Sequence, residues 1–201
     1  MRAASIIGIL GIACAPGGSA SGDTLSAAVP STAAAGGNQQ TACLIDSAGI
    51  AGVRLGMTLD EVRRALPAAR LERQEDGDGV LWVTVTVDTS RLVTLHAGEE
   101  DPAIDWTKQV TIIETFHPAC RTADGVHPGA LVADVERTWG ATSEIVLSEI
   151  ESREYVTFER QPAWLTLRLD YTGIFPEGSR RTTQYKKGAR LFSMSISVTS
   201  P

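Results

Sequence analysis

The stretch from Gly52 to Pro67 reads GVRLGMTLDEVRRALP, and a related phrase returns 73 residues later. The second copy, from Gly125 to Gly140, reads GVHPGALVADVERTWG and keeps two glycines, a valine and an arginine in register. A phrase repeated at a fixed period indicates two copies of one supersecondary unit, each too small to bury a core of its own. The sequence therefore predicts two tandem modules, at residues 43–122 and 123–201.

Each copy of the phrase predicts a short amphipathic helix. In the first copy Thr58 and Glu61 have the spacing of a capping box, in which both side chains satisfy free amide groups at the start of a helix, and Pro67 ends it. In the second copy Leu131 takes the place of the capping threonine and Gly140 follows the helix. The apolar stripes comprise Leu59, Val62 and Leu66 in the first helix, and Val132, Val135 and Trp139 in the second.

Strands are expected after each helix. Apolar and polar residues alternate from Val80 to Val87, as they do in a strand with one buried face. Further strands are expected at 91–97, 109–116, 153–159, 163–171 and 190–198. The predicted fold is α+β, with two tandem modules, each a helix plus an antiparallel three- to four-stranded meander, and with the helices on one face of the sheet.

The pattern from Gly52 to Val62, Gly-x-x-x-Gly-Met-Thr-x-x-Glu-Val, resembles the start of the BamE/SmpA-type outer-membrane lipoproteins. The doubled helix-plus-meander plan resembles the β-lactamase inhibitory protein, which is itself a tandem repeat of such a unit. The likeness covers residues 50–198 in plan, and about sixteen residues per copy in sequence. It implies a protein that acts by binding another protein, either as an assembly accessory of the envelope or as an inhibitor of a secreted or periplasmic hydrolase.

The N-terminus predicts export. Arg2 precedes a short apolar run from Ile6 to Ala13, which fits a secretory signal and is too short to span a bilayer. Ala13 before Cys14 resembles the lipobox of bacterial lipoproteins, which implies a signal peptide at 1–13 and a lipid on Cys14. Cleavage after a small residue such as Ala20, giving a plain secreted protein, and an unprocessed cytosolic chain are the alternatives.

Residues 14–42 are rich in Ala, Gly, Ser, Thr and Pro, and predict a flexible linker between an anchor and the folded part. By analogy with lipoprotein sorting, Ala15 after Cys14 implies the periplasmic side of the outer membrane. The membrane would then be reached through the lipid anchor only, and the protein would be secreted if Cys14 carries no lipid.

Two cysteines remain in the folded part. Cys43 and Cys120 lie just upstream of the two copies of the phrase, and an even pair in an exported chain predicts a disulfide. The three histidines are not at the spacing of paired metal ligands and no CxxC or HExxH occurs, so neither a metal nor a cofactor is expected. The net charge of −6 leaves no basic face for nucleic acid.

The polar side of the predicted strands is the candidate binding site. Trp82, Thr84, Tyr155, Trp164 and Arg168 fall on this side, and Trp, Tyr and Arg dominate the energetics of protein interfaces. The same side is expected to carry Thr86, Thr94, His96, Gln109, Thr111, Thr115, Thr157, Glu159, Thr166, Asp170, Ser193, Ser195 and Ser197. The alternative is that a loop or the linker covers the two tryptophans.

Catalysis requires a nucleophile, a base and an orienting group together, and the sequence offers no such cluster. The acidic pair Asp60-Glu61 is explained by the first turn of a helix. The sequence therefore predicts a non-enzymatic lipoprotein of the cell envelope that binds another envelope or secreted protein through the sheet face. Inhibition of a secreted or periplasmic hydrolase is the alternative.

Overall fold

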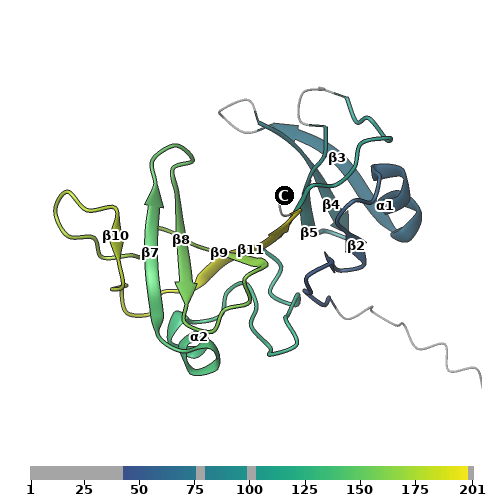
Figure 1. Ribbon diagram of the computed structural model, residues 1–201. Coiled ribbons are helices and arrows are strands. Elements are labelled where there is room, and N and C mark those ends of the chain that lie inside the picture. Colours follow the sequence, from purple (N-terminus) through teal and green to yellow (C-terminus); the bar gives the residue numbers. More distant parts are fainter. Residues whose placement is uncertain (1–42, 76–79, 99–102, 199–201) are drawn as a thin grey trace, which may run out of the picture. The chain divides into compact units, whose positions relative to one another are not determined.

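The computed structural model describes residues 43–75, 80–98 and 103–198 (Figure 1). The predicted signal peptide at 1–13, Cys14 with its lipid, and the linker at 14–42 lie outside these residues. The elements, in chain order, are β1 Gly49–Ile50, β2 Val53–Arg54, α1 Leu59–Ala65, β3 Ala69–Glu75, β4 Leu81–Val87, β5 Ser90–His96, β6 Ile112–Thr115, α2 Val132–Trp139, β7 Thr142–Ser148, β8 Arg153–Phe158, β9 Leu165–Leu169, β10 Arg181–Thr182 and β11 Leu191–Ser197.

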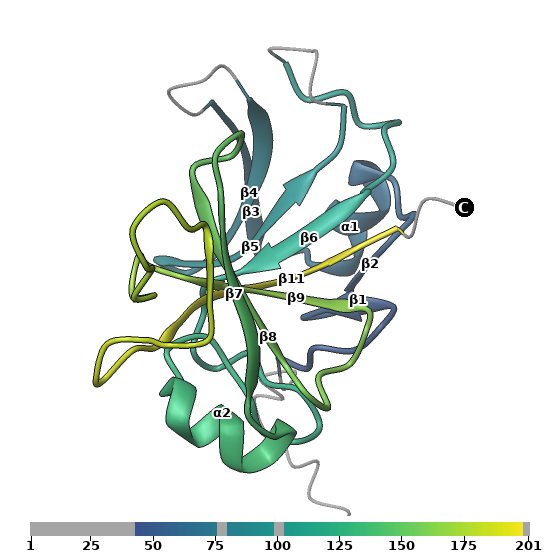
Figure 2. The ribbon, with the colours of Figure 1, turned by 60° about the vertical axis from the view of Figure 1, so that its left-hand side comes forward.

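One continuous antiparallel sheet of nine strands dominates the fold, in the order β10-β7-β8-β9-β11-β6-β5-β4-β3. Figure 2 shows β6 and β11 side by side in the middle of this sheet, where Ile113 pairs with Ile196 and Thr115 with Met194. Strands β1 and β2 form a separate short pair. The predicted α+β fold of two helix-plus-meander modules is therefore wrong. The described residues are mostly β, with two helices of only seven and eight residues.

The two-module prediction failed for two physical reasons. Strand β3 reads ARLERQE and lacks apolar alternation, because it lies at the edge of the sheet, where charged side chains remain in water. The pairing of β6 with β11 joins segments that are far apart in the sequence, and no local pattern reports such a contact. The boundaries 43–122 and 123–201, and the tandem relationship between the two segments, stay a prediction.

A single apolar core lies on one side of the sheet. Val83 and Val85 of β4, Leu95 of β5 and Ile196 of β11 belong to it. Both helices contribute, α1 with Leu59 and Val62, and α2 with Val132, Val135 and Trp139. The helices therefore cover the apolar side, and most of their stability comes from this packing because each is too short to persist alone.

The predicted start of α1 is confirmed. The amide of Glu61 donates to Thr58 Oγ1 at 3.2 Å, and the amide of Thr58 donates to Glu61 Oε2 at 2.8 Å, which completes the capping box. At the start of α2, Leu131 provides no side-chain cap. The glycines before the helices, Gly56 and Gly129, have φ of 81° and 86°, a conformation that most other residues avoid. The two copies of the phrase thus share one local backbone form.

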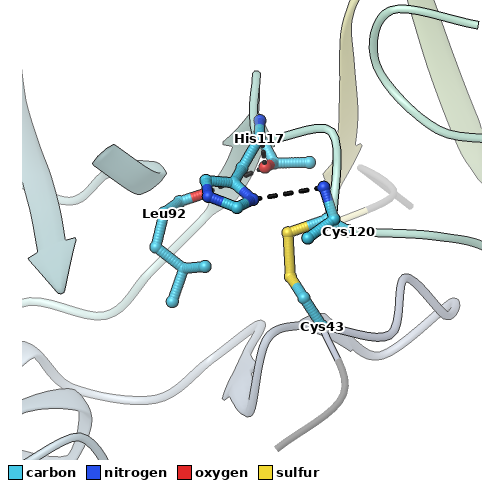
Figure 3. Close-up of a disulfide and its surroundings, with 6 residues drawn as sticks. Cys43, Leu92, His117 and Cys120 are labelled. Carbon is cyan, nitrogen blue, oxygen red and sulfur yellow. Dashed lines mark hydrogen bonds between the residues drawn. A yellow bond between two sulfur atoms is a disulfide. The ribbon is translucent and has the colours of Figure 1, made fainter. Parts of the chain in front are cut away.

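The predicted disulfide between Cys43 and Cys120 is confirmed (Figure 3). The two Cα atoms are 4.3 Å apart, and Cys120 is fully buried. Backbone hydrogen bonds from Arg121 N to Cys43 O, and from Ile45 N to Arg121 O, both 2.8 Å, continue the contact beyond the sulfur atoms. In the turn before Cys120, the amide of Ala119 donates to His117 Nδ1 at 3.2 Å. The first described segment is thereby fixed to the turn that follows β6.

Glu136 connects α2 to the start of β7. Its carboxylate accepts hydrogen bonds from Thr142 Oγ1 at 2.8 Å and from the hydroxyl of Tyr185 at 2.7 Å. Burial raises the pKa of Glu136, but the hydrogen bonds from Tyr185 and Thr142 outweigh it and leave the pKa below the ordinary value of 4.5. Burial and the hydrogen bond to Glu136 raise the pKa of Tyr185 to about 12.

These shifts predict a pH dependence that a Tyr185→Phe variant should lack. A raised pKa stabilises the fold below the unfolded value of 10.0, and this stabilisation is lost as the pH rises through the folded value of about 12. We expect the stability difference between wild type and variant to be present at about pH 8 and to shrink by about pH 11. Urea unfolding of both proteins at the two pH values measures it. An equal difference at both would contradict the hydrogen bond to Glu136.

Candidate binding face of the sheet

The strand register defines the side of the sheet opposite the core, which we call the polar face. One row runs through directly paired residues of β3, β4, β5, β6, β11 and β9, namely Glu72, Thr84, Thr94, Glu114, Ser195 and Thr166. A neighbouring row pairs Ser193 of β11 with Arg168 of β9, and Arg168 with Tyr155 of β8. Hydroxyl groups and charges of seven adjacent strands thus lie on one face of the sheet.

The central strand β6 contributes different residues from those expected. Thr115 pairs with Met194, is fully buried on the core side, and donates its hydroxyl to Leu92 O at 2.8 Å. Glu114 and Ile112 take the polar face instead. The assignment of Thr115 to this face is therefore wrong. A buried threonine that satisfies its hydroxyl on a backbone carbonyl is indistinguishable in sequence from an exposed one.

Glu114 is the centre of a shielded cluster. Its Oε1 accepts a hydrogen bond from Arg168 Nη1 at 2.9 Å and one from Ser193 Oγ at 2.5 Å. The side chains of Arg168 and Glu114 are only 17% and 10% exposed. An ion pair so far removed from water is maintained only where each charge has a partner, because leaving either one alone is costly. The cluster fixes the guanidinium of Arg168 in one orientation.

The five predicted site residues do not form one cluster. Trp82 and Thr84 belong to β4, whereas Arg168 and Tyr155 are paired on β9 and β8, and Trp164 lies in the turn just before β9. Four strand steps from β4 to β9 correspond to roughly 19 Å at the usual strand spacing. The predicted residues thus fall into two separate groups.

The side chains of the predicted site residues differ in their exposure to solvent. Thr84 is buried and donates to Gln74 Oε1 at 3.0 Å, so it is not an accessible contact. Tyr155 is half-buried and donates to a carboxylate oxygen of Glu151; burial and this bond raise its pKa, so the phenol stays neutral. Trp82 is half-buried, whereas Trp164 is 36% exposed.

A row of stacked arginine and phenylalanine side chains crosses four adjacent strands, and we call it the arginine–phenylalanine row. The guanidinium of Arg91, on β5, lies 4.4 Å from the ring centre of Phe116, directly after β6. The Phe116 ring meets that of Phe192, on β11, edge to face with centroids 5.1 Å apart. Phe192 in turn lies 5.3 Å from the guanidinium of Arg168 on β9. The two contacts at the ends of the row each place a cation over a ring.

The sequence prediction missed this row for a specific reason. Strict alternation on β11 would place Phe192 with Met194 and Ile196 in the core. A register shift between Leu191 and Ser193 instead inserts one extra residue, and Phe192 is 41% exposed. A bulge of this kind turns a side chain to the other face. The sequence carries no clear signal of the bulge.

Several buried side-chain atoms on the polar face have no hydrogen-bond partner among the described residues. They are Trp82 Nε1, Thr94 Oγ1 and Arg168 Nε. The fourth such atom in the described part of the chain, Thr172 Oγ1, lies outside the sheet. An unpaired buried donor costs about 1–3 kcal/mol, so the polar face contains hydrogen-bonding capacity that the fold itself does not use.

Among the described residues, no group of three His, Cys, Asp or Glu side chains is placed to hold a metal ion. The described helices are also too short and too polar to cross a membrane. The polar face presents arginine, aromatic and hydroxyl side chains.

Comparison with known proteins gives a likeness of fold. No protein-family model matches the chain, and no curated protein matches it. Among solved structures, it is similar to the crystal structure of the uncharacterized protein YfeY from Escherichia coli, at 12% sequence identity and a TM-score of 0.51. The match covers 76% of this chain and 97% of that chain. At this level of identity, the likeness shows a shared fold and nothing about function.

Proposed function

We propose that this protein is a non-enzymatic binding module of the cell envelope, and that it engages another envelope or secreted protein through the polar face. One observation carries the proposal: Phe192, 41% exposed, stacks on Arg168 of the polar face, which is paired there with Tyr155, and Trp164, in the turn before the same strand β9, is 36% exposed. Large aromatic and arginine side chains are the usual anchors of protein interfaces.

Electrostatics and rigidity give further support. The contacts of Arg168 with Glu114 and with Phe192 hold its guanidinium in place before any partner arrives. A side chain that is already ordered loses less conformational entropy on binding, so more of its contact energy appears as affinity. The disulfide supports an oxidising compartment.

We also propose that the signal peptide is cleaved between Ala13 and Cys14 and that Cys14 carries a lipid. This rests on the residues around Cys14 and on the resemblance to lipoproteins. Mass spectrometry of the native protein tests it: an N-terminus at Cys14 with acyl mass supports a lipoprotein. A chain that retains Met1 would exclude it, and one that begins after Ala20 would indicate a plain secreted protein.

The alternative function is inhibition of a secreted or periplasmic hydrolase, as the resemblance to the β-lactamase inhibitory protein implies. A disulfide-linked, preorganised sheet suits that task equally well. A pull-down from envelope extract separates the two: membrane-assembly components favour the accessory role, whereas a single soluble hydrolase, inhibited on addition of the protein, favours the alternative.

Replacing Trp164 by Ala tests whether the exposed ring serves binding. We expect a loss of less than about 1 kcal/mol in the free energy of unfolding, because the ring is largely in water, and about 2 kcal/mol or more in partner affinity. Trp82→Ala should cost about 2 kcal/mol in stability, because that ring is half-buried. Thermal melts can be measured before any partner is known. A stability loss of about 3–5 kcal/mol in Trp164→Ala would assign that ring to the core instead.

A further inference from the structure

A depression of about 440 Å³ adjoins the arginine–phenylalanine row. The residues that line it include Arg91, Phe116, Asp170, Arg190, Leu191 and Phe192. Its volume lies within the range of ligand pockets, though toward the small end, and fits one or two side chains rather than a large molecule.

The two arginines that line the depression are held by neutral contacts. Arg91 stacks on Phe116, and Arg190 Nη1 donates to the backbone carbonyl of Gly129 at 2.6 Å. Neither forms an ion pair with a carboxylate of the described residues. Among the described lining residues, Asp170 is the single acid, so the lining carries a net positive charge in a protein whose net charge is −6. This favours an anionic group in the depression.

The lining also favours an apolar group. Phe116 and Phe192 present an edge-to-face pair of rings, and Pro118 and Pro128 complete the apolar part. The register shift on β11 turns Phe192 out of the core to this position. The two rings and the two guanidinium groups of this lining together match a ligand that carries an apolar side chain next to a carboxylate.

We propose that this depression binds an acidic segment of a partner polypeptide, with an Asp or Glu carboxylate on Arg91 and Arg190 and an adjacent apolar side chain on Phe116 and Phe192. Guanidinium groups form paired hydrogen bonds with carboxylates, which gives the contact orientation as well as strength. The inference rests on the proposed function, because it names the chemistry of the partner at one end of the polar face.

Titration of the isotope-labelled full chain with N-acetyl-Asp-Phe-amide, followed by NMR, tests the proposal. We expect saturable shifts of the amides at Phe116 and Phe192. N-acetyl-Asn-Phe-amide, which has the same shape without the charge, should bind roughly 10-fold or more weakly. Equal shifts with both peptides, or no saturation with either, would overturn the acidic-segment proposal.

Matched variants locate the contact. Arg91→Gln and Arg190→Gln together should weaken the acidic peptide roughly 10-fold, and Phe192→Ala should weaken both peptides. Arg54→Gln removes one positive charge from an exposed arginine on β2 and should leave binding unchanged. If Arg54→Gln weakens binding as much as the pocket variants do, the effect is one of overall charge and the site is wrong.

The two proposals can fail separately. If the peptide does not bind but Trp164→Ala still abolishes capture of the partner, the depression is not the anchor and the polar face retains its function. If the peptide binds at the depression while Trp164→Ala and Trp82→Ala capture the partner as well as wild type, the proposed function of the sheet face is wrong.

Discussion

Replacing Glu114 by Ala is expected to lower the free energy of unfolding by about 3–5 kcal/mol. The substitution leaves Arg168, only 17% exposed, without its carboxylate partner, and it removes the acceptor of the Ser193 hydroxyl. The guanidinium already has one buried nitrogen, Nε, without a partner among the described residues. Urea unfolding of the full chain at neutral pH measures the loss.

A surface ion pair provides the control. Glu144 pairs with Arg181 at the edge of the sheet, where the two side chains are 36% and 69% exposed. Glu144→Ala should cost less than about 1 kcal/mol, because water screens the pair and replaces the lost contacts. If Glu114→Ala lowers the free energy of unfolding no more than Glu144→Ala does, the Glu114–Arg168 pair is not shielded from water in solution. The claim that Arg168 is held in place before a partner binds would then be wrong.

Removing the disulfide is expected to cost about 4 kcal/mol of stability. The bond joins residues separated by 77 positions, and a link across a loop of that length restricts the unfolded chain strongly. The double variant Cys43→Ser, Cys120→Ser should therefore unfold at a much lower urea concentration than the oxidised wild type. Adding a reductant should bring the wild type close to the variant.

The double variant is the control for other effects of the reductant. It has no disulfide to reduce, so adding the reductant should leave its unfolding unchanged. An oxidised wild type that unfolds at the same urea concentration with and without reductant would show that the bond contributes nothing measurable. The Cys43–Cys120 link would then have no structural role in solution, although its sulfur atoms meet in the folded chain.

Local features of this fold were predictable from sequence. Thr58 and Glu61 marked the start of α1 correctly, because the capping box depends only on neighbouring residues. The strict alternation from Val80 to Val87 gave β4 nearly to the residue, since the valines of one register, Val83 and Val85, face the apolar core. The cysteine pairing followed from parity, once Cys14 was set apart.

What the sequence could not show depends on contacts between distant segments. The pairing of Ile113 on β6 with Ile196 on β11 joins two sets of strands into one sheet. From the sequence alone, β6 and β11 could each have been an edge strand. Glu114 was overlooked because its partners, Arg168 and Ser193, lie 54 and 79 residues away. Phe192 lies on the polar face because of a bulge that the flanking residues do not predict.

Site-specific crosslinking tests the central claim most directly. A photo-crosslinking residue replaces Thr166, which is exposed on β9 in the polar face, or Ala65, which is exposed on α1 over the core side. Each full-length variant is then illuminated in intact cell envelopes. We expect one protein to be crosslinked from position 166 and not from position 65. Crosslinks from position 65 with none from position 166 would place the partner on the helical side and contradict the account.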